Sequence, residues 1–318
     1  MTRRELLQAA GCLGLTLAVP GLALPSAGSR AIKLGVITDL HFGFAPDAMA
    51  RFDDFLETLE AEKPDAVLQL GDFCHPEEAA RSLVKKWNSI KAPRINVLGN
   101  HDMDKGSKQQ IMDFWEMPSR FGIYDLARLS VVVLDLNNLE RQGKTLPYDK
   151  GNYFQSGQRL NLMDEEQKEW LAETLIKGEK PALILSHQPL GFAERGGQIP
   201  KEQQEVFDIL VQSRAENHKG AAAICLSGHL HVDRATIHQG FPCLSVNSAS
   251  YHWCDGMNPY RDSLFAFIEI HPNGAVKVRG KMSQFVNDPP KSPLAGFGPN
   301  ISDRRMTLWK SSGIILGE

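Results

Sequence analysis

Five short clusters of histidine, aspartate and asparagine occur along the chain in a fixed order. Their oxygen and nitrogen atoms are ligands that manganese, iron and zinc accept in proteins, and no thiolate lies among them. The set could hold two divalent metal ions and leave one histidine for proton transfer. A metal pair held in this way is suited to displacing a group at phosphorus. The clusters are Asp39-Leu40-His41, Gly71-Asp72, Gly99-Asn100-His101-Asp102, His187 and Gly228-His229-Leu230-His231.

Each cluster follows a short apolar run that predicts a buried β-strand. Helical patterns separate several of these runs, and such alternation is typical of parallel strands joined by crossover helices. Side chains at the carboxyl ends of these strands converge on one crevice. The predicted strands are 32–38, 66–70, 94–98, 130–136, 182–185 and 221–226, and the predicted helices are 48–62, 77–90, 164–176 and 201–213.

Spacing within the clusters supports the same convergence. Asp39 and His41 are two residues apart, so an extended backbone would point both to one side, and the same holds for the two histidines of the last cluster. Gly99 and Gly228 are expected to let the backbone turn sharply before the ligands that follow them.

The last third of the chain predicts strands with short turns, which we interpret as an antiparallel section that closes the fold. Two long loops rich in glycine, proline and charged residues, 137–158 and 189–200, are expected to shape a substrate pocket. The segment 284–318 is rich in proline and glycine and is interpreted as a tail. The strands of the last third are 234–238, 242–246, 264–270 and 275–281.

The motif order D-x-H, G-D, G-N-H-D, H and G-H-x-H, from residue 39 to 231, resembles the calcineurin-like metallophosphoesterase superfamily. The resemblance implies an α/β fold for residues 29–283. In that fold a β-sandwich of two mixed sheets is flanked by helices, which makes four αββα layers. The implied activity is metal-dependent hydrolysis of phosphate esters.

The resemblance also implies a role for each motif residue. Two divalent metal ions (Mn, Fe or Zn) would share Asp72 as a bridge, and a water or hydroxide held between them would attack phosphorus. His101 would protonate the leaving oxygen, with Asp102 orienting its ring. The ligands implied for the first ion are Asp39, His41, Asp72 and His231, and those for the second are Asp72, Asn100, His187 and His229.

Departures from the motifs narrow the branch. His75 stands where purple acid phosphatases carry a metal-binding tyrosine, and Phe73 and Met103 stand where protein phosphatases carry arginine. The chain therefore looks most similar to bacterial phosphodiesterases and pyrophosphatases that act on small, nucleotide-like substrates. An exported phosphomonoesterase is an alternative, and a non-catalytic scaffold is a remoter one, because the ligand set is complete. Candidate substrate contacts are His75, Tyr153, Arg195, Tyr251 and His252.

The N-terminus predicts a targeting segment. Arg3 and Arg4 precede a weakly hydrophobic run, which resembles a twin-arginine export signal over residues 1–28. We therefore expect export by the Tat machinery to the periplasm or medium, with a plain amphipathic helix as the alternative. Glycines and a proline interrupt the run, so no stable membrane anchor is expected.

Charge and cysteine content exclude further classes. The formal net charge is −3, which does not favour a nucleic acid polymer as partner. The sequence contains no C-x-x-C pair, so a structural zinc site is not expected. Cys243 and Cys254 are the nearest pair for a disulfide, and Cys225 is interpreted as an inert core thiol.

Overall fold

The computed structural model describes residues 30–193, 198–254, 256–289 and 298–308. The predicted export signal, Arg195 and parts of the predicted tail lie outside these ranges. Within the described residues, no helix combines the length and apolar character that crossing a membrane requires.

The first of two six-stranded sheets begins with three parallel strands, β1, β2 and β3. Helices α2 (Ala48–Glu62) and α3 (Arg81–Asn88) connect them as crossovers. Three antiparallel strands extend the other edge of the sheet. In spatial order the strands are β17 (Arg304–Thr307), β16 (Ala275–Arg279), β15 (Ala266–Ile270), β1 (Ile32–Ile37), β2 (Ala66–Gln69) and β3 (Arg94–Asn96).

The second sheet has a parallel centre, β12-β10-β9-β5, and one antiparallel strand at each edge. Helices α5 (Glu165–Lys177) and α6 (Lys201–Glu216) provide its crossovers. The strands in spatial order are β11 (Arg234–His238), β12 (Phe241–Ser245), β10 (Ala222–Ser227), β9 (Ala182–Leu185), β5 (Leu129–Val133) and β4 (Gly122–Leu126).

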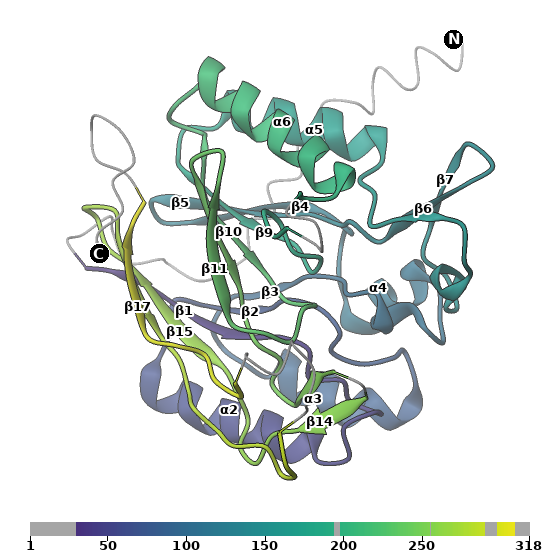
Figure 1. Cartoon of the computed structure of the whole chain (residues 1–318). Coiled ribbons are helices and arrows are strands. Elements are labelled where there is room, and N and C mark those ends of the chain that lie inside the picture. The colour runs from purple at the N-terminus through teal and green to yellow at the C-terminus, as the bar shows by residue number, and fades with distance from the viewer. Residues whose placement is uncertain (1–29, 194–197, 255, 290–297, 309–318) are drawn as a thin grey trace.

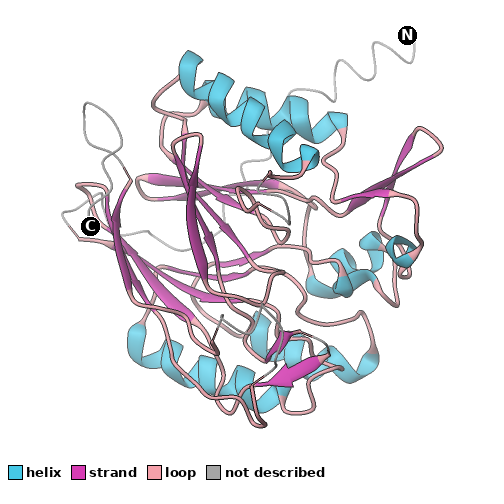
Figure 2. Ribbon diagram, in the orientation of Figure 1, coloured by secondary structure: helices cyan, strands magenta, loops and turns pink. Residues whose placement is uncertain are grey.

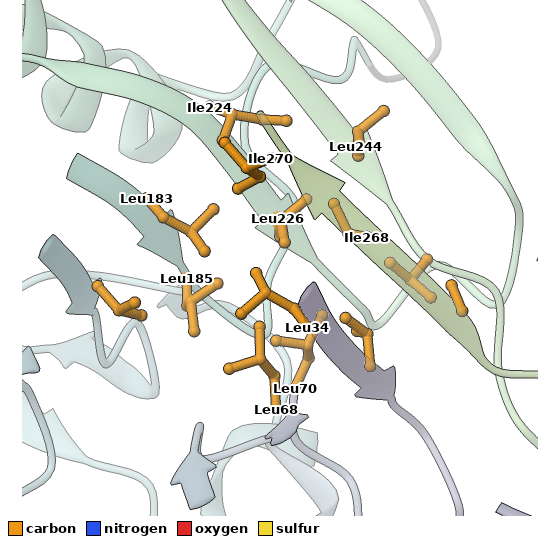
Figure 3. Packing of buried hydrophobic residues seen from close by; sticks show 14 of the residues in the cluster. Leu34, Leu68, Leu70, Leu183, Leu185, Ile224, Leu226, Leu244, Ile268 and Ile270 are labelled. Atoms are coloured by element: carbon orange, nitrogen blue, oxygen red, sulfur yellow. The ribbon is translucent and has the colours of Figure 1, made fainter. Parts of the chain in front are cut away.

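The two sheets pack face to face through branched aliphatic side chains. Figure 3 shows Leu34, Leu68, Leu185, Leu226 and Ile268 meeting between strands of both sheets. All five are at most 1% exposed, and burying each such side chain stabilises the fold by ~1.5–3 kcal/mol. The packing of the two sheets therefore sets the position of the carboxyl ends of one group of parallel strands relative to those of the other group.

Helices cover the outer face of each sheet (Figures 1 and 2). Phe52, Phe55 and Leu59 of α2 recur at helical spacing and are buried in a cluster with Val67 and Phe267 of the first sheet. A separate group of buried hydrophobic side chains packs α5 and α6 against the second sheet. The predicted αββα sandwich of two mixed sheets is thereby confirmed.

The segment 137–158 was predicted to be a long loop. It instead contains strands and a short 3-10 turn, and the loop assignment was therefore wrong. The segment contains the hairpin of β6 (Asn138–Arg141) and β7 (Lys144–Pro147), followed by a 3-10 turn, η3 (Asn152–Phe154), and β8 (Arg159–Leu160) pairs with β6. Gln142 and Gly143 have φ of 53° and 71°, the two-residue turn that twisted hairpins favour. The hairpin projects from the sandwich near α4 (Lys108–Trp115) in Figure 1.

The C-terminal strands do not form one antiparallel section. The β11–β12 pair joins the second sheet, where β12 runs parallel to β10, whereas β15 and β16 join the first. Strand β17, inside the segment interpreted as a tail, pairs with β16. A further small hairpin, β13 (Tyr251–Trp253) with β14 (Met257–Pro259), follows the last histidine cluster.

Candidate metal centre

The residues of the five clusters meet where strands of both sheets end. They follow β1, β2 and β3 in one sheet and β9 and β10 in the other. Potential ligand atoms of Asp39, His41, Asp72 and His231 lie within 4.8 Å of one another, and so do those of Asp72, His187 and His229. Asp72 belongs to both groups.

The ligand residues do not sit on extended backbone, as the two-residue spacing had suggested. Asp39, His41, Asp72, His229 and His231 all have positive φ, between 50° and 67°. Residues other than glycine rarely adopt this left-handed backbone conformation, and residues strained in this way are found mostly at functional sites. Five of the seven proposed ligand residues therefore lie in left-handed turns just beyond the strands.

Two of these turns are joined by backbone hydrogen bonds. The N–H of Asp39 donates to the carbonyl of Gly71 at 3.0 Å, and the N–H of His41 donates to the carbonyl of Asp72 at 2.9 Å. These bonds extend the alignment of β1 and β2 beyond the strand ends and join the first cluster to the second.

The first group surrounds a small volume between buried side chains. The Nε2 atoms of His41 and His231 lie 3.0 Å apart, and Nε2 of His231 lies 3.1 Å from Oδ1 of Asp39. Nε2 of His41 lies 3.7 Å from Oδ2 of Asp72. Nδ1 of His231 donates to the carbonyl of Tyr251 at 2.8 Å, which orients its Nε2 toward the group.

The second group is built in the same way. Nε2 of His187 lies 3.1 Å from Oδ2 of Asp72 and 3.2 Å from Nδ1 of His229. Nδ1 of His187 donates to the carbonyl of Leu70 at 2.7 Å, which leaves Nε2 facing inward. Oδ1 of Asn100 is buried without a hydrogen-bond partner. A buried orphan acceptor is costly, so these residues fit a cation.

Burial keeps two of the histidines neutral and ready to bind metal. It lowers the pKa of His41 to about 3 and that of His229 to about 4. Burial also opposes charging of His187, but the Asp72 carboxylate outweighs it and raises the pKa of His187 to about 9. A proton on that ring stands in for the positive charge that a metal ion would supply beside Asp72.

His101 lies beside both groups and remains 32% exposed in its side chain. Its backbone N–H donates to Oδ1 of Asp72 at 2.8 Å. Its ring Nδ1 pairs with Oδ2 of Asp104 at 2.8 Å, and the Tyr153 hydroxyl donates to the other oxygen of Asp104. Asp104 is thus the residue that orients the His101 ring.

The expectation that Asp102 orients His101 was wrong. The Asp102 carboxylate is buried and accepts hydrogen bonds from the backbone N–H groups of Asp72, Phe73, Cys74 and Gly99, at 2.7 to 3.1 Å. These bonds tie the second cluster to the third. A turn of 3-10 helix, η2 (His101–Met103), instead carries Asp104 back to His101, and three-residue spacing was the available signal for it.

Gly99 and Gly228 serve close packing rather than the sharp turn that the sequence had suggested. Neither has positive φ among the described glycines. A Cβ at Gly99 would lie 2.2 Å from the Asp72 backbone nitrogen, and one at Gly228 would lie 2.1 Å from Oγ1 of Thr38. Only glycine lets these loops approach closely enough to bring the ligands together.

Four of the five candidate substrate contacts lie around the centre. Tyr153 bonds Asp104 and lies 3.2 Å from Nδ1 of His101, and His75 places Nε2 3.8 Å from Asp104. The Tyr251 ring packs 5.0 Å from the His41 ring and 4.8 Å from that of His231. His252 is buried behind them, with Nδ1 3.0 Å from the His231 carbonyl. The fifth, Arg195, lies outside the described residues.

The four cysteines of the described residues are buried free thiols. Cys225 lies opposite Cys243 in the parallel register of β10 and β12, whereas Cys254 follows β13 in a different hairpin. The structure therefore contains no bond between Cys243 and Cys254, and Cys225 is a core residue, as expected.

Comparison with known proteins identifies a family and a fold. The family model described as calcineurin-like phosphoesterase matches residues 32–233. A crystal structure of a dimetal phosphatase from zebrafish (Danio rerio) superposes with a TM-score of 0.60 at 14% identity, covering 88% of this chain and 100% of that one. GAP50, an anchor in the inner membrane complex of Plasmodium, gives 0.55 at 13% identity, covering 88% and 90%. No curated protein sequence matches the chain.

Proposed function

Because the chain belongs to the calcineurin-like phosphoesterase family, we propose that it hydrolyses phosphodiester or diphosphate bonds of a nucleotide-like small molecule with two bound metal ions. The observation that carries the proposal is the pair of ligand groups that share Asp72, with His101 beside them. A complete ligand set also argues against a purely structural role, because docking alone does not need it.

The residues divide the work in a definite way. Asp39, His41, Asp72 and His231 would hold one ion, and Asp72, Asn100, His187 and His229 the other. Two such ions lower the pKa of a bound water and stabilise charge on phosphoryl oxygens.

Proton transfer falls to His101. Asp104 occupies Nδ1 of its ring, so Nε2 is the nitrogen that can donate a proton to the leaving oxygen. Asp104 acts on the substrate only through His101 and is a positioning residue.

The preference for a diester or diphosphate linkage over a monoester follows from the motif departures at His75, Phe73 and Met103, which separate the chain from purple acid phosphatases and protein phosphatases.

A hydrolysis panel on purified protein reconstituted with manganese tests the proposal. It compares bis-p-nitrophenyl phosphate with p-nitrophenyl phosphate, and then cyclic AMP, ADP-ribose and CDP-choline. We expect turnover of the diester or diphosphate substrates that chelation abolishes and added manganese restores. Preference for the monoester would establish the phosphomonoesterase alternative. Two bound ions without turnover of any substrate would favour the scaffold.

We further propose that residues 1–28 direct export through the twin-arginine machinery, on the basis of Arg3 and Arg4 before the weakly hydrophobic run. Replacing both arginines with lysine should retain the protein in the cytoplasm of a bacterial host. Cell fractionation measures this, and equal amounts of both forms in the periplasm would contradict the proposal.

A further inference from the structure

Three aromatic rings form a column that runs from the core to the rim of the metal centre. The rings of Tyr148 and Tyr153 stack with centroids 4.6 Å apart, and the rings of Tyr153 and Phe154 are 4.4 Å apart. Tyr148 is 1% exposed, Tyr153 8% and Phe154 65%. The column therefore starts in a fixed position and ends with a ring open to solvent.

A second exposed ring approaches the same point from another part of the chain. Phe44 follows β1, is 43% exposed and lies 5.9 Å from the His101 ring. The Phe154 ring lies 6.0 Å from the same imidazole. Two phenyl rings that are distant in sequence thus lie close to the ring of the proposed proton donor.

Folding alone does not account for this exposure. An exposed phenyl ring adds little hydrophobic stabilisation, since that term scales with the apolar area removed from water. The local backbone nevertheless holds Phe154 in place. Gly151 has a φ of 67°, and a Cβ there would lie 3.0 Å from the Phe154 ring. The turn is shaped so that the ring can lie against it.

We propose that Phe44 and Phe154 form an aromatic subsite beside His101 that takes a flat ring, such as a nucleobase or an aryl group, on the substrate phosphate. The inference rests on the proposed function. A phosphoryl group bound at the metal centre must place its leaving group next to His101 if His101 is to protonate it. That leaving group lies against the two phenyl rings. Neutral aromatic faces bind flat rings by stacking and are indifferent to their hydrogen-bonding edges.

Equilibrium binding of phosphonates to the manganese-loaded protein tests the subsite without turnover, because an ester hydrolase does not cleave their carbon–phosphorus bond. The probes are methylphosphonate, phenylphosphonate and cyclohexylphosphonate, measured by titration calorimetry. We expect phenylphosphonate to bind about tenfold more tightly than methylphosphonate and about threefold more tightly than cyclohexylphosphonate, which has a puckered ring of the same size.

Single substitutions test whether Phe44 and Phe154 are responsible for the tighter binding of phenylphosphonate. Phe154→Ala and Phe44→Ala should each reduce phenylphosphonate affinity severalfold and leave methylphosphonate affinity unchanged. Ile237→Ala removes another exposed apolar side chain, on edge strand β11, and should change neither. Thermal unfolding of each variant confirms that it is folded.

The outcomes separate the two proposals. Equal affinity for phenyl- and cyclohexylphosphonate would overturn the flat-ring subsite, and so would a loss in the phenylalanine variants that is the same for methylphosphonate. Binding of methylphosphonate would still support the phosphate site itself. Failure of all three phosphonates to bind the metal-loaded protein would overturn the subsite, whereas the hydrolysis panel decides the proposed function separately.

Discussion

The carboxylates of Asp72 and Asp104 both favour the protonated form of the His101 ring. Burial of the ring opposes its charging, yet Asp72 and Asp104 together raise the pKa of His101 to about 9. Bound metal ions would offset the charge of Asp72, so Asp104 is the carboxylate that would continue to favour the protonated ring.

Replacing His101 with alanine should reduce turnover ~10²–10⁴-fold, which is the usual contribution of a proton donor. Metal content should stay at the wild-type level, because His101 belongs to neither ligand group. Elemental analysis alongside steady-state kinetics measures both quantities. Metal loss in step with activity would instead make His101 a ligand or a structural residue.

Asp104→Asn should reduce turnover by roughly tenfold for p-nitrophenyl esters and by more for esters of simple alcohols. A poor leaving group depends more on protonation, so an effect on the orientation of His101 should grow with leaving-group pKa. A series of diesters with alcohols of increasing pKa measures this. An equal reduction across the series, with KM changed as well, would point to a general structural role.

At the scale of elements, the centre depends on loops rather than on the strands themselves. Asp102, in the loop after β3, accepts three hydrogen bonds from backbone N–H groups of the loop after β2 and a fourth from Gly99 of its own loop. Gly99 lets the same two loops touch. The ligand positions of Asp72 and Asn100 are therefore fixed relative to each other by contacts that contain no ligand atom.

Asp102→Ala should lower the free energy of unfolding by at least about 3 kcal/mol, because it leaves buried N–H groups without an acceptor. Metal affinity should fall with it, since the second and third clusters lose their connection. Urea unfolding of the metal-free protein and metal titration measure the two effects. Asp104→Asn is the matched control and should retain both stability and metal binding.

At the scale of the molecule, a bidentate ion pair joins the end of α2 to the first sheet. Arg279 of β16 donates to both oxygens of Glu62, at 3.0 and 2.6 Å, and Lys33 of β1 lies 3.0 Å from the same carboxylate. The Arg279 hydrogen bonds outweigh partial burial and lower the pKa of Glu62 from 4.5 to about 2. Helix α2 is thereby held to both halves of this sheet.

Glu62→Gln should destabilise the protein by up to about 1 kcal/mol at neutral pH. A carboxyl whose pKa is lower in the folded state contributes stability above its unfolded pKa and loses it on further acidification. The difference between wild type and variant should therefore shrink as pH falls from about 4.5 toward about 2. Denaturant unfolding across this range measures it, and a difference independent of pH would refute the ion-pair contribution.

The sequence by itself determined the ligand set and the core of the fold. The apolar runs before Asp39, Asp72 and His229 form strands, and each cluster lies at a carboxyl end, because strand pattern and motif spacing are local properties. The helices at 48–62, 165–177 and 201–216 follow helical periodicity in the same way.

Tertiary structure alone decided which side chains act together. The carboxylate that pairs with His101 is Asp104 and not its neighbour Asp102, because the backbone N–H groups of another loop occupy Asp102. The distribution of the C-terminal strands over two sheets and the meeting of Phe44 with Phe154 at one imidazole likewise depend on packing between distant segments. Such contacts arise from the geometry of the assembled sandwich, which local periodicity does not encode.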